Sequence, residues 1–453
     1  MFNKQADFNL ELEKKTCVIS SNTDNELVKT ILGKLNINKQ DLGCDLEIIH
    51  SLGKLAMKKV IIINEDKILD KGLSKLFDLK EDVIILLDTF SKVTIKDLFT
   101  VLVESTYRFN TFKSKEKPSE VNLYYYSDND YTEPISAGMI YGEAVNHVKQ
   151  LVNLPYNYLN AEKLTNYAQE LESIGNLTVK VYGKAECEAM KMGAFLGVNK
   201  GSKDEPQLIH VRYIGNKESK EIVSLVGKGV MFDTGGYSIK NGTGMPTMKC
   251  DMAGAATVLG AIEIIARLKY PHNVDCVIAA TDNKIGDDAI VPDDILTAAN
   301  GLTIEILSTD AEGRLTLADA LWFAQKEGAT KLIDIATLTG SIVATLGKEY
   351  TGAFTNNQNF LNELIALSEK TKEKLWQMPI SEGYRKELES FSADLKNSHS
   401  NRLAGASVAA AFLEKFVENN TPWIHLDIAG TAFDEKKGGS GIMVKTLAEY
   451  FNK

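Results

Sequence analysis

The sequence predicts an α/β protein made of a smaller N-terminal domain and a larger C-terminal domain, and three observations support this prediction. Short apolar runs typical of strands alternate with amphipathic runs typical of helices along the chain. Two polar, charged stretches, at 113–120 and 127–134, interrupt this alternation and indicate a boundary. The chain has 453 residues, which is enough for two or three domains with substantial cores.

The N-terminal domain is expected to span residues 1–130. Strands are expected at 16–21, 58–64, 82–88 and 121–127, where β-branched and aromatic residues form short apolar runs, and a helix is expected at 95–109. Residues 131–157 are expected to connect the domains, mainly through a helix at 135–153. The sequence of this domain contains no cluster of residues that points to a particular chemistry.

The C-terminal domain is expected to span residues 158–453, with more glycine and alanine. The expected strands are 221–227, 273–280, 302–308, 331–338 and 423–430, and the expected helices are 252–269, 320–326, 406–418 and 442–451. This alternation predicts a mainly parallel sheet that is covered by helices on both faces. Ligands of such sheets bind beyond the carboxyl ends of the strands.

Composition excludes several classes of protein. The net charge of −10 disfavours broad binding to nucleic acid or to anionic membranes. No apolar run approaches the roughly 18 residues of a membrane-spanning helix, and the first residues lack the apolar core of a secretory signal. The five cysteines are far apart and form no C-x-x-C pair, so we expect reduced thiols in a cytoplasmic protein.

The stretch STDAEGRL (308–315) allows two interpretations. Thr309 and Glu312 match the capping box of a helix that starts in this stretch. If the backbone is extended instead, Asp310, Glu312 and Arg314 point to one face and form a cation or anion site after a strand. The stretch alone does not decide between these interpretations.

A second unusual stretch, 226–254, contains Lys228, Asp233, Lys240 and Asp251 between an expected strand and an expected helix. Each residue has an ordinary alternative role. The glycines could cradle a phosphate, although the Walker A pattern is not met. Asp251 could cap the helix that follows, and Lys240 could be a solvated lysine.

Taken together, the two stretches favour a site for two metal ions. The six histidines are scattered and form no H-E-x-x-H, so any metal site must depend mainly on carboxylates. Carboxylates can bridge two divalent ions, which activate a water molecule. A lysine can bind a metal when it is neutral, and a second, charged lysine can stabilise a developing oxyanion.

Five motifs of this chain resemble those of the leucyl (cytosol) aminopeptidases, the M17 metallopeptidases. They are VGKGVMFDTGG with YSIK, MKCDMAGAA, STDAEGRL, IATLTG and WIHLDIAGTA, in the family's order and at its intervals. The resemblance covers roughly residues 136–453. It implies a catalytic domain with a central mixed sheet flanked by helices, peptide substrates and a homohexamer built as a dimer of trimers.

The resemblance also implies a role for each residue of the two stretches. Asp233 and Glu312 would contact both metals, Asp310 the loosely held one, and Lys228 and Asp251 the tightly held one. The metals would be zinc, with manganese, magnesium or cobalt at the exchangeable position. Lys240 would bind the scissile carbonyl.

Two further sets of residues follow from the resemblance. Arg314 would hold a bicarbonate ion that acts as general base, helped by backbone groups near Ala311, Gly313 and Leu338. An apolar pocket for a leucine-like first residue would be lined by Met248, Thr337, Gly340, Ala429 and Ala432. The alternative for these five residues is ordinary core packing.

The chain departs from the family at Ser308, where the family usually has an asparagine whose side chain helps to fix the loop. Two other functions stay open at this point. Another dimetal hydrolase, such as a phosphoesterase, would use a similar set of carboxylates. A non-catalytic member that binds DNA or regulates transcription is disfavoured by the acidic net charge.

Overall fold

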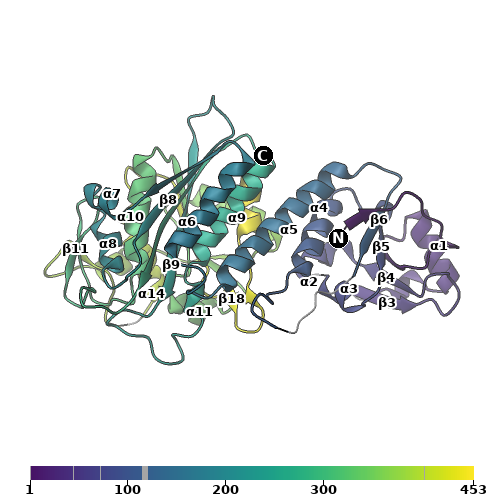
Figure 1. Ribbon diagram of the computed structural model, residues 1–453, viewed down its shortest axis with the longest axis horizontal. Coiled ribbons are helices and arrows are strands. Elements are labelled where there is room, and N and C mark those ends of the chain that lie inside the picture. The colour runs from purple at the N-terminus through teal and green to yellow at the C-terminus, as the bar shows by residue number, and fades with distance from the viewer. Residues whose placement is uncertain (1, 44, 72, 115–120, 402, 453) are drawn as a thin grey trace. The chain divides into compact units, whose positions relative to one another are not determined.

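The computed structural model describes residues 2–43, 45–71, 73–114, 121–401 and 403–452 (Figure 1). It divides into two compact units, Met1–Asn146 and His147–Lys453. The division falls within α5 (Thr132–Asn153), which contains the helix expected at 135–153. The finer limits of 1–130, 131–157 and 158–453 stay a prediction, and most of the charged stretch 113–120 lies outside the described residues.

The first unit is built around a six-stranded sheet in the order β1-β6-β5-β2-β4-β3. All neighbouring strands are parallel except β3 and β4. The strands are β1 (Phe2–Lys4), β2 (Thr16–Ser20), β3 (Leu46–His50), β4 (Lys59–Ile63), β5 (Val83–Leu86) and β6 (Leu123–Tyr126). The helices are α1 (Glu26–Leu35), α2 (Ile68–Lys71), α3 (Ser74–Asp78) and α4 (Thr94–Thr106), with short 3-10 turns η1 (Lys39–Asp41), η2 (Glu65–Lys67) and η3 (Leu87–Thr89). The four strands and the helix expected from the sequence are present.

Both faces of this sheet are buried, because the central strands alternate their side chains between two apolar clusters. Cys17 and Ile19 of β2 pack into the cluster that contains the buried face of α1. Val18, between them, packs into the cluster that contains α4. The strands therefore read as continuous apolar runs, which explains why they were visible in the sequence.

The second unit contains an eight-stranded mixed sheet in the order β15-β14-β17-β13-β9-β10-β8-β7. Its strands are β7 (Leu177–Tyr182), β8 (Gln207–Ile214), β9 (Ile222–Asp233), β10 (Asn273–Asn283), β13 (Lys331–Ala336), β14 (Thr351–Thr355), β15 (Leu375–Gln377) and β17 (Trp423–Asp427). The four central strands, β17, β13, β9 and β10, are parallel. Antiparallel pairs flank them on both sides. The sheet is therefore mixed, with a parallel centre.

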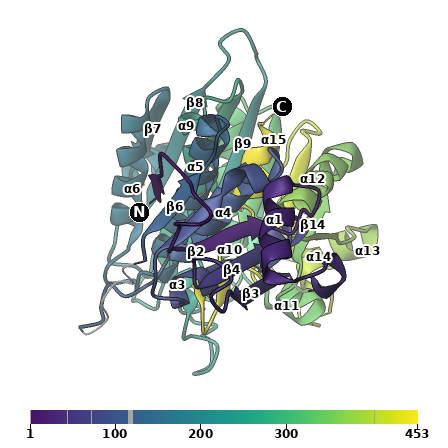
Figure 2. The ribbon, with the colours of Figure 1, turned by 90° about the vertical axis from the view of Figure 1, so that its right-hand side faces the viewer.

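Helices cover both faces of this sheet (Figures 1 and 2). One layer contains α6 (Ala161–Glu170), α9 (Ala253–Arg267), α12 (Gln358–Thr371) and α15 (Val444–Tyr450). The other contains α8 (Gly193–Asn199), α10 (Gly313–Lys326) and α14 (Gly405–Glu414). The remaining helices are α7 (Lys184–Ala189), α11 (Gly340–Leu346) and α13 (Glu382–Lys386), with 3-10 turns η4 (Leu171–Ile174) and η5 (Met248–Cys250).

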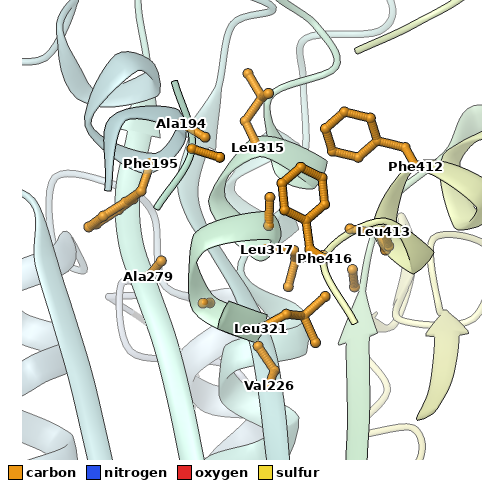
Figure 3. Close-up of a cluster of buried hydrophobic side chains, with 14 of the residues drawn as sticks. Ala194, Phe195, Val226, Ala279, Leu315, Leu317, Leu321, Phe412, Leu413 and Phe416 are labelled. Atoms are coloured by element: carbon orange, nitrogen blue, oxygen red, sulfur yellow. The ribbon is translucent and has the colours of Figure 1, made fainter. Parts of the chain in front are cut away.

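The helix α10 is held in the core of the second layer. Figure 3 shows Leu315, Leu317 and Leu321 of α10 among Phe195 of α8 and Phe412 of α14. All five side chains are buried. Packing on several sides fixes the direction of α10, and with it the position of the residues at its N-terminal end.

One expectation for this unit was wrong in detail. The run 302–308 is not a strand of the main sheet, because only β12 (Thr303–Glu305) forms there. It pairs with β11 (Ile295–Thr297) and β16 (Leu395–Lys396) in a separate sheet. The tight turn between β11 and β12, closed by the Ala298 N–H on the Leu302 carbonyl at 2.9 Å, makes this local pairing favourable. The helix expected at 320–326 is the C-terminal half of α10. A two-stranded ribbon, β18 (Phe433–Asp434) and β19 (Gly438–Gly439), completes the unit.

The four described cysteines are free and buried, which agrees with reduced thiols: Cys17, Cys187, Cys250 and Cys276. Cys44 lies outside the described residues. Within the described ranges, none of the helices combines the length and the apolarity that crossing a bilayer requires.

Candidate active site

The charged residues of both sequence stretches meet at the carboxyl ends of the central parallel strands. Asp233 is the last residue of β9, Asn283 is the last residue of β10, and Asp427 is the last residue of β17. Because parallel strands end at the same edge of a sheet, these side chains lie close together. A pocket of about 630 Å³ opens at this edge.

Lys228 lies at the floor of this pocket and is 3% exposed. Its ammonium lies 2.8 Å from Oδ2 of Asp251 and 3.0 Å from Oε1 of Glu312. It also donates to the carbonyl of Thr337 at 3.0 Å. The buried Lys228 therefore joins β9, the stretch before α9, the start of α10 and the end of β13.

Lys240 holds a second pair of carboxylates. Its Nζ lies 2.8 Å from Oδ2 of Asp233 and 2.7 Å from Oδ1 of Asp310, so it is not a solvated surface lysine. Oδ1 of Asp233 accepts from the N–H of Gly235 and from Nδ2 of Asn283, at 2.8 and 2.9 Å. Every oxygen of Asp233 is thus occupied and its orientation is fixed.

Three of the carboxylates, those of Asp233, Asp310 and Glu312, have oxygen atoms within 4.8 Å of one another. Burial and the nearby charge of Asp233 raise the pKa of Asp310, and they raise that of Glu312 to about 8. Burial raises the pKa of Asp251 to about 6, against the opposite effect of Lys228. Because these acids are buried close together, the site favours the binding of cations.

The same crowding acts on the two lysines in the opposite direction. Burial alone would lower the pKa of Lys228 and of Lys240. The surrounding carboxylates outweigh burial and raise both pKa values above the ordinary range. Without a metal, both side chains are therefore ammonium ions that compensate part of the negative charge.

Each interpretation of the stretch 308–315 was right in part, because a helix begins here and Asp310 and Glu312 belong to one acidic cluster. The backbone is not extended, because the Ala311 N–H closes a turn on the Ser308 carbonyl at 3.3 Å and α10 begins at Gly313. No side-chain cap is present either: the hydroxyl of Thr309 accepts from the Ser238 N–H and donates to the Gly235 carbonyl. The loop holds its acids in place through partners that lie more than 70 residues away.

Asp251 does not cap α9. The residue at the N-cap position is Met252, and it makes no side-chain cap bond. Oδ1 of Asp251 instead accepts from the hydroxyl of Thr337 at 2.8 Å, and Oδ2 faces Lys228. The whole carboxylate is thus directed at the pocket floor.

Arg314 is 7% exposed and lines the pocket. Its Nη1 donates to the Asn397 carbonyl at 2.6 Å, while its Nε has no hydrogen-bond partner among the described residues. Burial lowers the pKa of the guanidinium to about 10, so it stays charged at neutral pH. A buried guanidinium with a free N–H at a helix N-terminus is suited to an anion.

Most of the other predicted residues also lie at the pocket. Its lining includes Met248, Ala311, Thr337, Leu338, Gly340 and Ala429. Ala432 is buried in the turn after β17 and does not belong to the lining. Gly313 lies behind the pocket, where a Cβ atom would come within 2.6 Å of Nζ of Lys228, so only glycine leaves room for that lysine.

Three polar residues that hold the site were missed from the sequence. Asn283 bonds Asp233 and the Thr309 carbonyl, both at 2.9 Å. Asp427 accepts from the N–H of Leu338 at 3.1 Å, and Asn397 contacts the loop 307–311. Asn283 follows the strand expected at 273–280, and Asp427 lies within the strand expected at 423–430, so their positions near strand ends carried a usable signal. Asn397 lies in an irregular stretch and carried none.

Comparisons with known proteins agree with this geometry. Residues 146–448 match the model of the cytosol aminopeptidase family, catalytic domain. The chain is similar to a probable cytosol aminopeptidase of Bacillus subtilis, with 43% identity over 390 residues, which are 82% of this chain and 78% of that protein. A probable cytosol aminopeptidase of Bacillus licheniformis is 42% identical over 395 residues, which are 83% of this chain and 79% of that protein. The fold matches that of a mutant of tomato leucine aminopeptidase with a TM-score of 0.86 and 28% identity, over 99% of this chain and 96% of that chain.

Proposed function

Because this chain belongs to the cytosol aminopeptidase family and is therefore a metal-dependent aminopeptidase, we propose that it removes leucine-like residues from the N-termini of short peptides with the help of two divalent cations. The observation that carries the proposal is the convergence of Asp233, Asp310 and Glu312, with oxygen atoms within 4.8 Å of one another. Asp233 and Asp310 line the pocket, and Glu312 is buried beside them against Lys228.

The residues present fit a pair of divalent cations. Four carboxylates, counting Asp251, face only two ammonium groups. Oxygen ligands suit manganese and magnesium, and zinc and cobalt accept oxygen together with the nitrogen of a neutral lysine. We propose that Lys228 and Asp251 hold the tightly bound ion, that Asp310 holds the exchangeable one, and that Asp233 and Glu312 contact both. When bound, the ions lower the pKa of a water molecule and polarise the scissile carbonyl.

Lys240 is proposed to bind the carbonyl oxygen of the scissile bond. Its ammonium is partly exposed at the pocket and is kept charged by Asp233 and Asp310. A fixed ammonium is suited to the negative charge that develops on that oxygen, because it needs no reorganisation during the reaction. Loss of one such donor typically reduces kcat by about 10²- to 10³-fold.

Arg314 is proposed to hold a bicarbonate ion, which would supply a general base at this position. The free Nε of Arg314 and the first N–H groups of α10, near Ala311 and Gly313, supply donors of the kind that bind anions. The N–H of Leu338 already donates to Asp427, so Leu338 is proposed to contact the bicarbonate ion only through its other backbone and side-chain atoms.

The first side chain of the substrate is proposed to enter the apolar part of the pocket, which is lined by Met248, Thr337, Gly340 and Ala429, with Ala432 behind them. Gly340 leaves open space, since a Cβ there would meet no neighbouring atom. A branched aliphatic side chain suits such a surface. By the family resemblance, we also propose a cytoplasmic homohexamer built as a dimer of trimers.

The test is a metal-dependent assay on the purified protein with leucine-p-nitroanilide and, in parallel, p-nitrophenyl phosphate. We expect hydrolysis of the anilide alone, loss of activity after chelation, and its return with Zn²⁺ or Mn²⁺. Lys240→Ala and Asp310→Ala should each reduce kcat by at least about 10²-fold. Lys348→Ala, which removes an exposed ion pair with Asp434, is the matched control and should keep full activity. Unchanged activity in both pocket variants would refute the mechanism.

A further inference from the structure

Asn397 is a fully buried residue directly after β16, and both ends of its side-chain amide are used. Its Oδ1 accepts from the N–H groups of Leu307 and Ser308, at 2.9 and 3.3 Å. Its Nδ2 donates to the carbonyls of Ser308 and Ala311, at 2.7 and 3.4 Å. One side chain therefore binds the loop on both sides of Asp310.

The backbone of Asn397 extends this contact to the rest of the site. Its carbonyl accepts from Nη1 of Arg314 at 2.6 Å, and its N–H donates to the Glu305 carbonyl at 2.9 Å. The loop thus has two supports. Thr309 fixes one side of it through Gly235 and Ser238, and Asn397 fixes the other.

The side chain of Ser308 contributes little to this support. Among the described residues, its hydroxyl accepts from the N–H of Asp310 alone, at 3.3 Å, which is a local turn contact. An amide that bridges two segments 86 to 90 residues apart in the chain restrains the loop far more. Buried backbone groups that lose such partners are costly, so the loop would move to find new ones.

We propose that Asn397 is a positioning residue that sets the places of Asp310, Glu312 and Arg314, and that it supplies the restraint that Ser308 cannot supply. The inference builds on the proposed function. Residues that orient metal-binding side chains typically change metal affinity or activity by about 10- to 100-fold when they are removed. Replacing a residue that only stabilises the fold changes neither the metal affinity nor the activity of the protein that folds.

The chain offers a matched control for the purely structural role. Asn273 is 6% exposed, and its amide also makes three backbone bonds, with Asn216 N–H at 3.0 Å and with the carbonyls of Asn216 and Ser219 at 2.8 and 2.9 Å. It is the first residue of β10, whose last residue, Asn283, bonds Asp233 of the pocket and lies about 33 Å away along the strand. Asn273→Ala therefore removes a comparable set of bonds far from the site.

The experiment measures the Mn²⁺ dissociation constant of chelator-treated protein, kcat and KM with leucine-p-nitroanilide at saturating Mn²⁺, and the melting temperature. Asn397→Ala should raise the dissociation constant by about 10- to 100-fold and lower kcat. Asn273→Ala should lower only the melting temperature. Adding Ser308→Asn to Asn397→Ala should restore part of the affinity, because an amide then returns to the same loop.

If Asn397→Ala does not fold, Asn397→Asp replaces it, since it keeps the volume and the acceptor for Leu307 and Ser308 but loses the donor to Ser308 and Ala311. The inference is overturned if the folded Asn397 variant binds Mn²⁺ as the wild type does, or if Asn273→Ala weakens binding equally. Either result leaves the wild type active. Failure of the proposed function would instead appear as a wild type that neither binds Mn²⁺ nor cleaves the anilide.

Discussion

Replacing Lys228 with methionine removes a charge from the most buried part of the site and leaves the shape of the side chain nearly unchanged. The ammonium of Lys228 lies 2.8 Å from Asp251, 3.0 Å from Glu312 and 3.0 Å from the Thr337 carbonyl. In chelator-treated Lys228→Met, two buried carboxylates lose their closest cation. We expect this variant to be much less stable than the wild type under the same conditions.

Two estimates bracket the size of the loss. Removing one partner of a buried ion pair costs about 3–5 kcal/mol. If Asp251 instead takes up a proton at pH 7, the cost is about 4 kcal/mol, but the wild type, in which its pKa is already about 6, bears about 3 of this, so the added loss is about 1 kcal/mol. The melting temperature of the catalytic unit should therefore fall by about 3–15 °C.

The dependence of stability on pH distinguishes loss of the Lys228 charge from a general loss of packing. In the variant, the folded-state pKa values of Asp251 and Glu312 lie above their unfolded values. The folded variant therefore has its full stability below the unfolded pKa values and loses stability as the pH rises through the folded pKa values. At pH 5 Asp251 is mostly protonated in the wild type as well, because its pKa there is about 6, so both proteins bear the same cost. The part of the difference that comes from Asp251 should therefore nearly vanish.

The assay is thermal unfolding of chelator-treated protein from pH 5 to pH 8, followed by circular dichroism. Lys348→Met is the control, since its ion pair with Asp434 is exposed and should change stability by no more than about 0.5 kcal/mol. A Lys228→Met protein that melts within about 2 °C of the wild type at pH 7, or whose deficit grows at low pH, would refute the reasoning.

Three further predictions concern neighbouring positions. Gly313→Ala should weaken Mn²⁺ binding at least about tenfold in a titration, because the new Cβ displaces Lys228; wild-type affinity would contradict the close fit. Arg314→Met should lower kcat by about 10²-fold and abolish any stimulation of the anilide assay by added bicarbonate; a preserved response would contradict its role. Burial lowers the pKa of His425, but Asp334, at 2.6 Å from Nδ1, outweighs burial, so the pKa of His425 is raised in the folded protein. The ion pair therefore stabilises the fold fully below the ordinary pKa of 6.5, and this stabilisation is lost as the pH rises through the folded-state pKa. Asp334→Asn should therefore flatten the fall of the melting temperature between pH 6 and pH 9, and an unchanged profile would show that His425 is neutral throughout.

The parts of the fold that could be predicted share one physical property. Strands such as β5 and β13 are buried on both faces, so each reads as an uninterrupted apolar run. The strand β8 was missed because His210 and Arg212 interrupt its apolar pattern. In the structure both side chains are paired with Asp275 on the neighbouring strand. Pairing between distant segments is not visible in a local pattern.

The same distinction applies to the site. The residue types and their positions after strands indicated that Lys228, Asp233 and Asp310 belong to a cation site, and the family resemblance gave each of them a role that stays a prediction. The shape of the loop around Asp310 could not be predicted from the sequence. It depends on Thr309 and Asn397, whose partners lie more than 70 and more than 80 residues away.

The position of β17 has a consequence for synthesis of the protein. Although β17 is the last of the eight strands of the main sheet in chain order, it lies between β13 and β14. Asp427 at its end fixes the backbone of Leu338, and Ala429 forms part of the pocket wall. A growing chain on the ribosome therefore has an open sheet and an unfinished pocket until β17 has been made. Peptide cleavage should begin only once β17 is in place, so that chains that still lack it do not act on neighbouring nascent N-termini.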